Sequence, residues 1–523
     1  MTSLRFQRPD AGSVTKTAAE RLPFDVRFKA FRNQLRKFSL RSLVEEALRM
    51  TSLPPDDVVE SLRCFPWLPM LIVKWALLDR MVFADVGAPM TKERLAALID
   101  ELWNFEGDLL KQKLGGTAHP LIRPRVFVQV LFQRKATRAF VRIPALLSRL
   151  PADHGLRKLF HAQWQLTPEQ FVDLAIVIYS ARFGENKPGF NRSFFKPLEK
   201  EYGTVAIDRM LGMFSRDLQG LREELLGAED MGLGKGLAHR RRSELFEFPF
   251  FKRFPLYRHS PDVYFVWHPT VLSRALEDAV HLRLSDAGKE YSEPFSKVFE
   301  KYVVELARDA HQYLYTEADI KNSRGSQSSS VEAVIPFDQC NVLIEAKMGL
   351  YPDEVITATM PEIVRHKLRD LCKAVVQGAK VAEMLDSGDL IFDQVAQTQT
   401  NYLLVVTSRD LFVGRGEVLD AICSAGAIAY PTDVAKTLLP LTHVFFVSID
   451  GFEQIIAAVR AGEANLPELL AHAVELNAVP GGAGYWLEGH MSAEARAVKD
   501  RGSLIDVAWE ASHARLALAL ADV

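Results

Sequence analysis

Residues 331–347, VEAVIPFDQCNVLIEAK, constrain the fold more than any other part of the chain. Two short apolar runs rich in β-branched residues, Val331–Pro336 and Asn341–Lys347, flank the polar stretch FDQC. Short runs of this kind, joined by a few residues suited to a turn, predict an antiparallel hairpin with Phe337–Cys340 as its loop. A hairpin must bury at least one face, so the chain has to build a sheet around it.

The hairpin carries charged residues on one side. Side chains alternate across a strand, so Glu345 and Lys347 point to one face while the residues between and before them point to the other. With a four-residue loop, Glu332 falls opposite Glu345, and cross-strand partners share a face. We therefore expect two carboxylates and an ammonium group to converge.

The surrounding residues predict an α/β layered domain with a mixed sheet covered by helices. Helical periodicity marks two segments and apolar runs mark two further strands. A short extended piece and a polar loop complete the pattern, and helices follow to the end of the chain. The expected elements are a helix at Glu293–His311, an extended piece at Tyr313–Ile320, a loop at Asn322–Ser330, a helix at Pro361–Leu385, and strands at Tyr402–Ser408 and His443–Ile449.

The N-terminal half has a different pattern. From Asp25 to Leu226 apolar residues recur at three- and four-residue spacing, and Thr91 and Thr167 stand where helix N-caps belong. A chain of 523 residues is expected to form more than one domain. We predict a helical domain at 1–226, a linker and packing segment at 227–263, and the α/β domain at 264–523. The glycines of GLGKG in the linker predict a flexible turn.

Composition narrows the class of protein. The four cysteines lie far apart without metal-ligand spacing, which argues against a disulfide framework or a zinc site and fits a reducing cytoplasm. No segment has the length and apolarity of a membrane span. The net charge of −2 means that any nucleic-acid binding must use local basic patches. Candidate patches are Arg27–Arg41, Arg134–Arg142 and His239–Arg242, although such runs more often form solvated helix faces.

Converging carboxylates and a lysine suit phosphodiester hydrolysis. Two carboxylates held close repel each other, and a divalent cation such as Mg²⁺ relieves that repulsion. A neighbouring ammonium group can orient a water and offset the charge that develops on a phosphate. Glu and Lys also alternate on the solvated face of many edge strands, so the triplet alone does not establish this chemistry.

The stretch from Phe295 to Ser408 as a whole resembles the PD-(D/E)XK nuclease superfamily, especially its restriction-endonuclease-like and defence-associated members. The resemblance matches Glu332 and the Glu345-x-Lys347 pair to the family's metal-binding strands. It implies Mg²⁺- or Mn²⁺-dependent cleavage of DNA, in restriction or antiviral defence. The site residues that it implies are Glu300 from a preceding helix, with Glu305 as its substitute, Glu332 and Glu345 as metal ligands, Lys347, and Gln377 from the following helix, with Lys373 one turn earlier.

The sequence departs from the family in one carboxylate. Glu332 stands where the family has an aspartate, and its extra methylene could re-aim the metal site. Asp338 is an alternative, but its place in the predicted turn favours Glu332. Two other functions stay open. The chain could be a catalytically weakened DNA-binding or scaffold protein in a larger complex, or a helical regulator. In the nuclease, the helical N-terminal half would bind nucleic acid, sense a trigger, or mediate assembly with a partner protein or a second copy.

Overall fold

The structure is a computed structural model of the chain, and it describes eleven stretches of it. Cys64, the GLGKG segment predicted to be a turn, and the basic run His239–Arg242 lie outside them. The described residues form two compact units, each interrupted in sequence, which divide the chain at other points than the predicted boundaries. The described stretches are 23–52, 67–109, 138–181, 189–230, 244–325, 329–349, 361–390, 400–423, 426–479, 484–498 and 503–521.

The first unit comprises residues up to 116 together with 215–245 and 249–268. It is mainly helical, and its strands β2 and β3 pair in parallel while β3 and β4 pair antiparallel. Its elements are α1 (Phe24–Leu35), α2 (Leu40–Thr51), α4 (Trp67–Leu78), α5 (Lys92–Leu109), β2 (Ser215–Arg216), α12 (Leu218–Asp230), β3 (Leu256–Ser260) and β4 (Val263–Val266). The buried carboxylate of Glu244 accepts a hydrogen bond from Trp75 Nε1 at 2.6 Å and pairs with Lys74 at 2.8 Å.

The second unit contains a helical part and the sheet. In the helical part the buried Asp173 accepts hydrogen bonds from Tyr202, Ser512 and Arg515, which ties the C-terminal helix to residues more than 300 positions earlier. The elements of this part are α7 (Arg142–Ser148), α8 (Gly155–Trp164), α9 (Pro168–Ala181), β1 (Gly189–Asn191), α10 (Glu199–Tyr202), α11 (Thr204–Phe214) and α24 (Leu504–Ala521).

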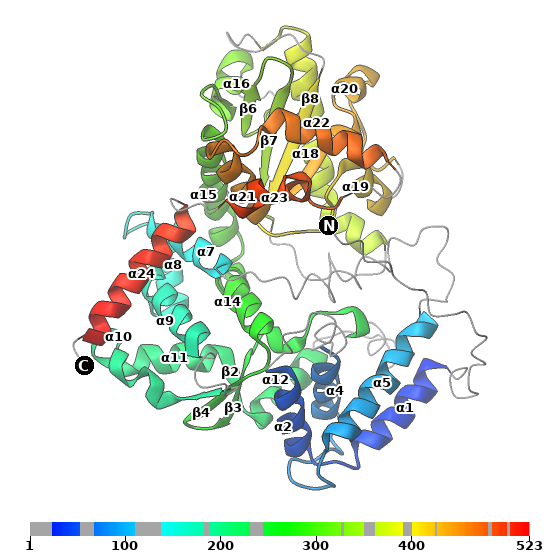
Figure 1. Ribbon diagram of the computed structural model, residues 1–523, viewed down its shortest axis with the longest axis vertical. Coiled ribbons are helices and arrows are strands. Elements are labelled where there is room, and N and C mark those ends of the chain that lie inside the picture. Colours follow the sequence, from blue (N-terminus) through cyan, green and yellow to red (C-terminus); the bar gives the residue numbers. More distant parts are fainter. Residues whose placement is uncertain are drawn as a thin grey trace. The chain divides into compact units, whose positions relative to one another are not determined.

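The rest of the second unit consists of a five-stranded sheet in the order β5-β6-β7-β8-β9 and the helices around it. Strands β6, β7 and β8 of this sheet are labelled in Figure 1. Pairing is antiparallel from β5 to β7 and parallel from β7 to β9. The strands are β5 (Tyr315–Thr316), β6 (Ala333–Pro336), β7 (Asn341–Lys347), β8 (Asn401–Thr407) and β9 (Val444–Ser448). The helices are α14 (Pro269–Leu284), α15 (Lys289–Arg308), α16 (Glu317–Arg324), α18 (Pro361–Asp386), α19 (Gly416–Cys423), α20 (Asp433–Leu438), α21 (Ile449–Arg460), α22 (Leu466–Ala478) and α23 (Ala493–Ala497).

The predicted fold class is confirmed, because helices dominate the N-terminal half and a mixed sheet with covering helices forms the C-terminal half. The predicted strand Asn341–Lys347 has the observed bounds of β7. The helical periodicity that runs as far as Leu226 does not give one continuous helix after Thr204, because the short strand β2 separates α11 from α12. The Asp217 carboxylate accepts a hydrogen bond from Gly220 N at 2.8 Å, which satisfies the start of a new helix.

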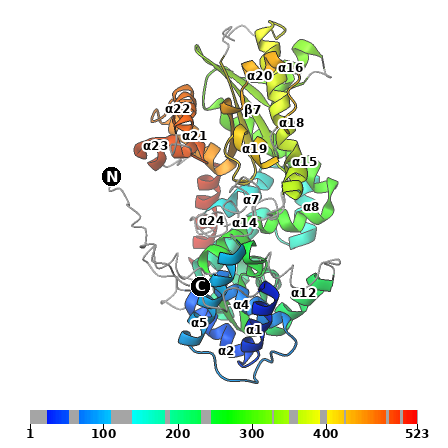
Figure 2. The same ribbon diagram turned by 90° about the vertical axis from the view of Figure 1, so that its right-hand side faces the viewer.

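Helix α18 packs closely on the sheet. Its apolar side chains share one buried cluster with Leu343, Leu403 and Val405, and α21 lies on the opposite side of the sheet (Figure 2). Gly378 allows this approach, since a Cβ atom there would lie 2.8 Å from Leu403 Cδ2. This close packing brings the neighbouring Gln377 within reach of Lys347 on β7.

No helix in the described stretches has both the length and the apolarity needed to cross a bilayer.

Substituting Gly378→Val should destabilise the protein by about 1–3 kcal/mol, because the new side chain overpacks the contact with Leu403. The midpoint of urea unfolding, followed by circular dichroism, measures the loss. Gly212→Ala is the control, since Gly212 is an exposed helical position with open space around it and alanine should be neutral or slightly stabilising. Equal midpoints for the two variants would contradict the close helix–sheet contact.

Candidate active site

The β6–β7 hairpin has the predicted four-residue loop. Pro336 pairs with Asn341, and Phe337 N donates to Cys340 O at 2.9 Å. The pairing runs in register as far as Ala333 and Ile344. Glu332 is the residue before β6, so one further step of the same register sets it opposite Glu345.

The residue that follows strand β5 and begins α16 is a third glutamate, which sequence reasoning missed. Thr316 pairs with Ala333, so the next residue, Glu317, stands beside Glu332, and Glu317 N donates to Glu332 O at 3.1 Å. Glu317, just after β5, Glu332, just before β6, and Glu345 in β7 therefore form a row along this edge of the sheet. The sequence does hold a signal for Glu317, because Thr316 and Asp319 form a capping box that starts α16 directly after the strand.

Lys347 lies at the centre of the predicted contacts. Its Nζ donates to the Glu345 carboxylate and, at 3.5 Å, to Gln377 Oε1 of α18. The Glu345 side chain is only 4% exposed and that of Lys347 is 23% exposed. Glu345, Lys347 and Gln377 thus come together as the sequence predicted, on the α18 side of the sheet. Lys373 instead is exposed and pairs with Asp370 at 2.8 Å.

Helix α15, which packs on β6 and β7, carries Glu300. Its carboxylate accepts from Ser296 Oγ and Lys297 Nζ, both at 2.8 Å. The substitute candidate Glu305 has a different partner, Arg149 at 2.8 Å. Asp338 is exposed in the hairpin loop, as expected for a turn residue.

Burial and neighbouring charges raise the pKa values of two of the glutamates, Glu332 and Glu345. Burial, followed by the charges of Glu345, Glu300 and Glu317, raises the pKa of the Glu332 carboxyl to about 8, and Lys297 offsets part of this effect. Burial also raises the pKa of Glu345, while Lys347 acts in the opposite direction. Burial and the neighbouring carboxylates therefore both disfavour the charged form of Glu332.

The group of four glutamates consists of Glu300, Glu317, Glu332 and Glu345. Lysine side chains pair with three of them. Lys297 pairs with Glu300, Lys347 pairs with Glu345, and Lys321 pairs with Glu317 at 2.6 Å. Glu332 has neither a hydrogen bond to its carboxylate nor an ion pair within the part of the chain that the structure describes. It is the carboxylate best placed to gain from an added cation.

The donor set suits a hard cation rather than zinc. No group of three or more His, Cys, Asp or Glu side chains among the described residues is arranged to hold a metal ion. Mg²⁺ usually takes one or two carboxylates and completes its shell with water and substrate phosphate oxygens. Glu332 and Glu345 supply oxygen donors of that kind, so the Mg²⁺ site stays a prediction that the residues fit.

Comparisons with protein-family models, with curated proteins and with solved structures found no match for this chain.

Replacing Lys347 with methionine should destabilise the protein by about 1–3 kcal/mol at pH 8, because the buried Glu345 carboxylate loses its counter-charge. The loss should shrink as the pH falls, since a protonated Glu345 needs no partner. Urea unfolding midpoints at pH 5 and pH 8 measure both effects. The control Lys373→Met removes an exposed pair from α18 and should cost less than about 0.5 kcal/mol. A Lys347→Met midpoint equal to the control at pH 8 would contradict the buried pair.

Proposed function

We propose that this chain is a metal-dependent nuclease of the PD-(D/E)XK type that hydrolyses phosphodiester bonds of DNA. The observation that carries the proposal is the row Glu317, Glu332 and Glu345, with Lys347 beside it and Gln377 above it. A setting in restriction or antiviral defence rests on the resemblance of residues 295–408 alone.

Each residue has a role that its position supports. Glu332 and Glu345 would hold Mg²⁺, which when bound polarises a phosphoryl oxygen and a water molecule. Lys347 would donate to the attacking water or to the phosphate, after release from its contact with Glu345. Gln377 would keep the Lys347 ammonium in place through Oε1. Glu300 would act on the site as a nearby charge.

Exposed basic residues on α18 support a nucleic-acid contact. Arg365 and Arg369 are exposed and lie four residues apart, so they lie along one stripe of the helix. Lys373 continues the spacing, although its charge is partly used in its pair with Asp370. The same spacing continues to Gln377. A stripe of this kind can contact successive phosphates of a backbone that enters the site.

The basic patches expected in the N-terminal half give less support. In Arg27–Arg41, Arg36 and Arg41 pair with Asp79 and Asp85, so much of the charge is used within the first unit. Arg142 of the second patch is neither a nucleic-acid contact nor part of a solvated face, because it is buried and pairs with Asp450 and Glu453. Residues 134–137 and 239–242 lie outside the described residues.

Plasmid cleavage in Mg²⁺ tests the proposal. Glu345→Ala and Lys347→Ala should each lower the rate at least about 100-fold, because they remove a metal ligand and a charge donor. Glu332→Ala should do the same, whereas Asp338→Ala, at an exposed loop position, should cleave like the parent protein. Equal cleavage by all four variants would remove this site from the mechanism, and loss in Asp338→Ala alone would move the metal ligand to the loop.

The second candidate function is a DNA-binding or scaffold protein that no longer cleaves. The pairing of Lys347 with Glu345 favours it, because the lysine already neutralises a carboxylate that the metal would need.

Calorimetric titration with Mn²⁺ separates the two functions. The nuclease should bind Mn²⁺, and Glu332→Gln should lose this binding because it removes a charged ligand. The Asp338→Asn control should bind like the parent protein. Absence of Mn²⁺ binding by the parent protein, together with retained DNA binding, would favour the scaffold function.

A further inference from the structure

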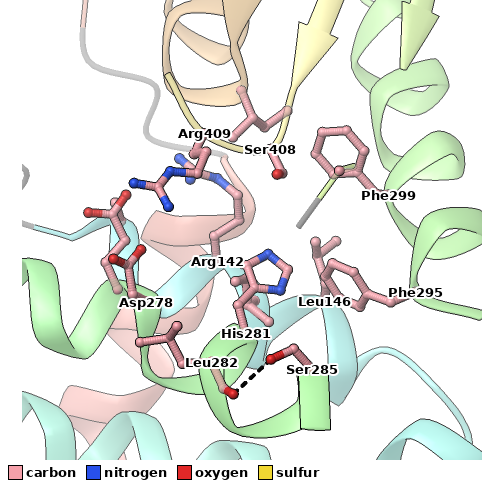
Figure 3. Close-up of a pocket in the computed structure, with 15 residues that line it drawn as sticks. Arg142, Leu146, Asp278, His281, Leu282, Ser285, Phe295, Phe299, Ser408 and Arg409 are labelled. Carbon is pink, nitrogen blue, oxygen red and sulfur yellow. Dashed lines mark hydrogen bonds between the residues drawn. The ribbon is translucent and has the colours of Figure 1, made fainter. Parts of the chain in front are cut away.

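The second unit also contains a cavity of about 220 Å³ that has no role in the proposed cleavage of DNA (Figure 3). It lies where β7, β8 and β9 end, and its lining includes Gly349, Ser408, Arg409 and Ile449 from these strand ends. Helices α7, α14 and α15 close it. The carboxyl ends of parallel strands are the usual place for ligands in open α/β sheets.

Aromatic and aliphatic side chains form part of the cavity lining. Phe295 and Phe299 of α15 line it together with Leu146 of α7, and all three are almost fully buried. Leu282 of α14 also lines it but is 53% exposed, which places this side chain at the mouth. Two phenylalanine rings next to aliphatic side chains suit a flat aromatic ligand.

The polar groups of the lining present both acceptors and donors. Asp278 of α14 supplies a carboxylate, and Arg409 supplies a guanidinium group (Figure 3). Glu277 of α14 adds a second carboxylate to the lining. Glu277 pairs with Arg274 at 2.8 Å. Arg142 contributes little further charge, because Glu453 accepts from it at 2.7 and 2.8 Å and Asp450 also pairs with it.

His281 adds a neutral hydrogen-bonding group. Its Nδ1 lies 2.5 Å from Tyr291 Oη, and its ring meets Phe295 edge to face. Burial lowers the pKa of His281 to about 4, so the ring is uncharged at neutral pH. With Nδ1 engaged, Nε2 is the ring atom left to contact a ligand.

We propose that this cavity binds an amino-bearing nucleobase of the adenine or cytosine type. The carboxylates of Asp278 and Glu277 would accept hydrogen bonds from the exocyclic amine, and Arg409 or His281 would contact a ring nitrogen or carbonyl oxygen. The phenylalanine rings would pack against the base. The cavity is smaller than the ~300–1,000 Å³ of sites for drug-sized ligands, which matches a base or nucleoside better than a larger cofactor.

Helix α15 connects the cavity with the group of glutamates around Glu332. Phe299 lines the cavity, and the next residue, Glu300, belongs to the carboxylate group. Gly349 at the cavity is likewise two residues beyond Lys347. A base held here could come from a free nucleoside or from a nucleic-acid strand whose phosphates lie on the neighbouring site. Base binding itself requires neither metal nor cleavage, so it can be tested apart from the nuclease proposal.

Calorimetry of the full chain without divalent metal tests the base site. Adenosine and cytidine are titrated first, with uridine, which lacks the amine, as the control ligand. A short single-stranded oligonucleotide and its abasic counterpart then distinguish a base within a strand from a free nucleoside. We expect an amino-bearing nucleoside, or the intact oligonucleotide in preference to the abasic one, to bind at least tenfold tighter than its control.

Two variants locate the binding. Leu282→Trp fills the mouth from an exposed helix position and should abolish binding, while the fold is preserved. Asp278→Asn should weaken binding at least tenfold, because an amide nitrogen replaces one acceptor oxygen. Asp286→Asn is the matched control, since Asp286 is exposed and does not line the cavity. Binding of neither nucleoside nor oligonucleotide, or binding that Leu282→Trp leaves unchanged, would overturn the inference.

Discussion

The antiparallel pairing of β6 with β7 determines where the charged groups of the candidate site lie. The pairing aligns Ala333 with Ile344, and this register sets Glu332 opposite Glu345. A slip of one residue would move Glu332 to the other face of the sheet and leave Glu345 and Lys347 without it. The same register, continued into β5, brings Glu317 beside Glu332.

The parallel half of the sheet gives this hairpin a rigid support. Strand β7 also pairs with β8 along all seven of its residues, and both strands are buried almost throughout. Helix α18 packs on them at Gly378, which brings Gln377 to Lys347. Because parallel strands end at one edge, the same arrangement opens the cavity beyond Gly349 and Ser408.

The concentration of glutamates makes this region electrostatically costly. Three lysines offset Glu300, Glu317 and Glu345, but Glu332 stays without an ion pair in the described structure. A fold selected for stability alone would gain from a neutral side chain at position 332. Such local conflict with the requirements of folding is characteristic of functional sites, and an added cation is the simplest way to relieve it.

The local sequence pattern was sufficient to predict β7, the four-residue loop and α18, because side-chain alternation and turn preferences act between near neighbours. These elements in turn predicted that Glu332, Glu345 and Lys347 lie close together. Strand β3 was missed within the segment read as a linker, and β4 was missed at the C-terminal boundary of that segment. Tertiary structure alone decided the rest. Glu317 joins the row through pairing with a strand 15 residues away, and Arg142 is buried by carboxylates more than 300 residues away. Contacts between residues so distant in the chain leave no periodic signal in the sequence, since their geometry depends on how the whole unit packs.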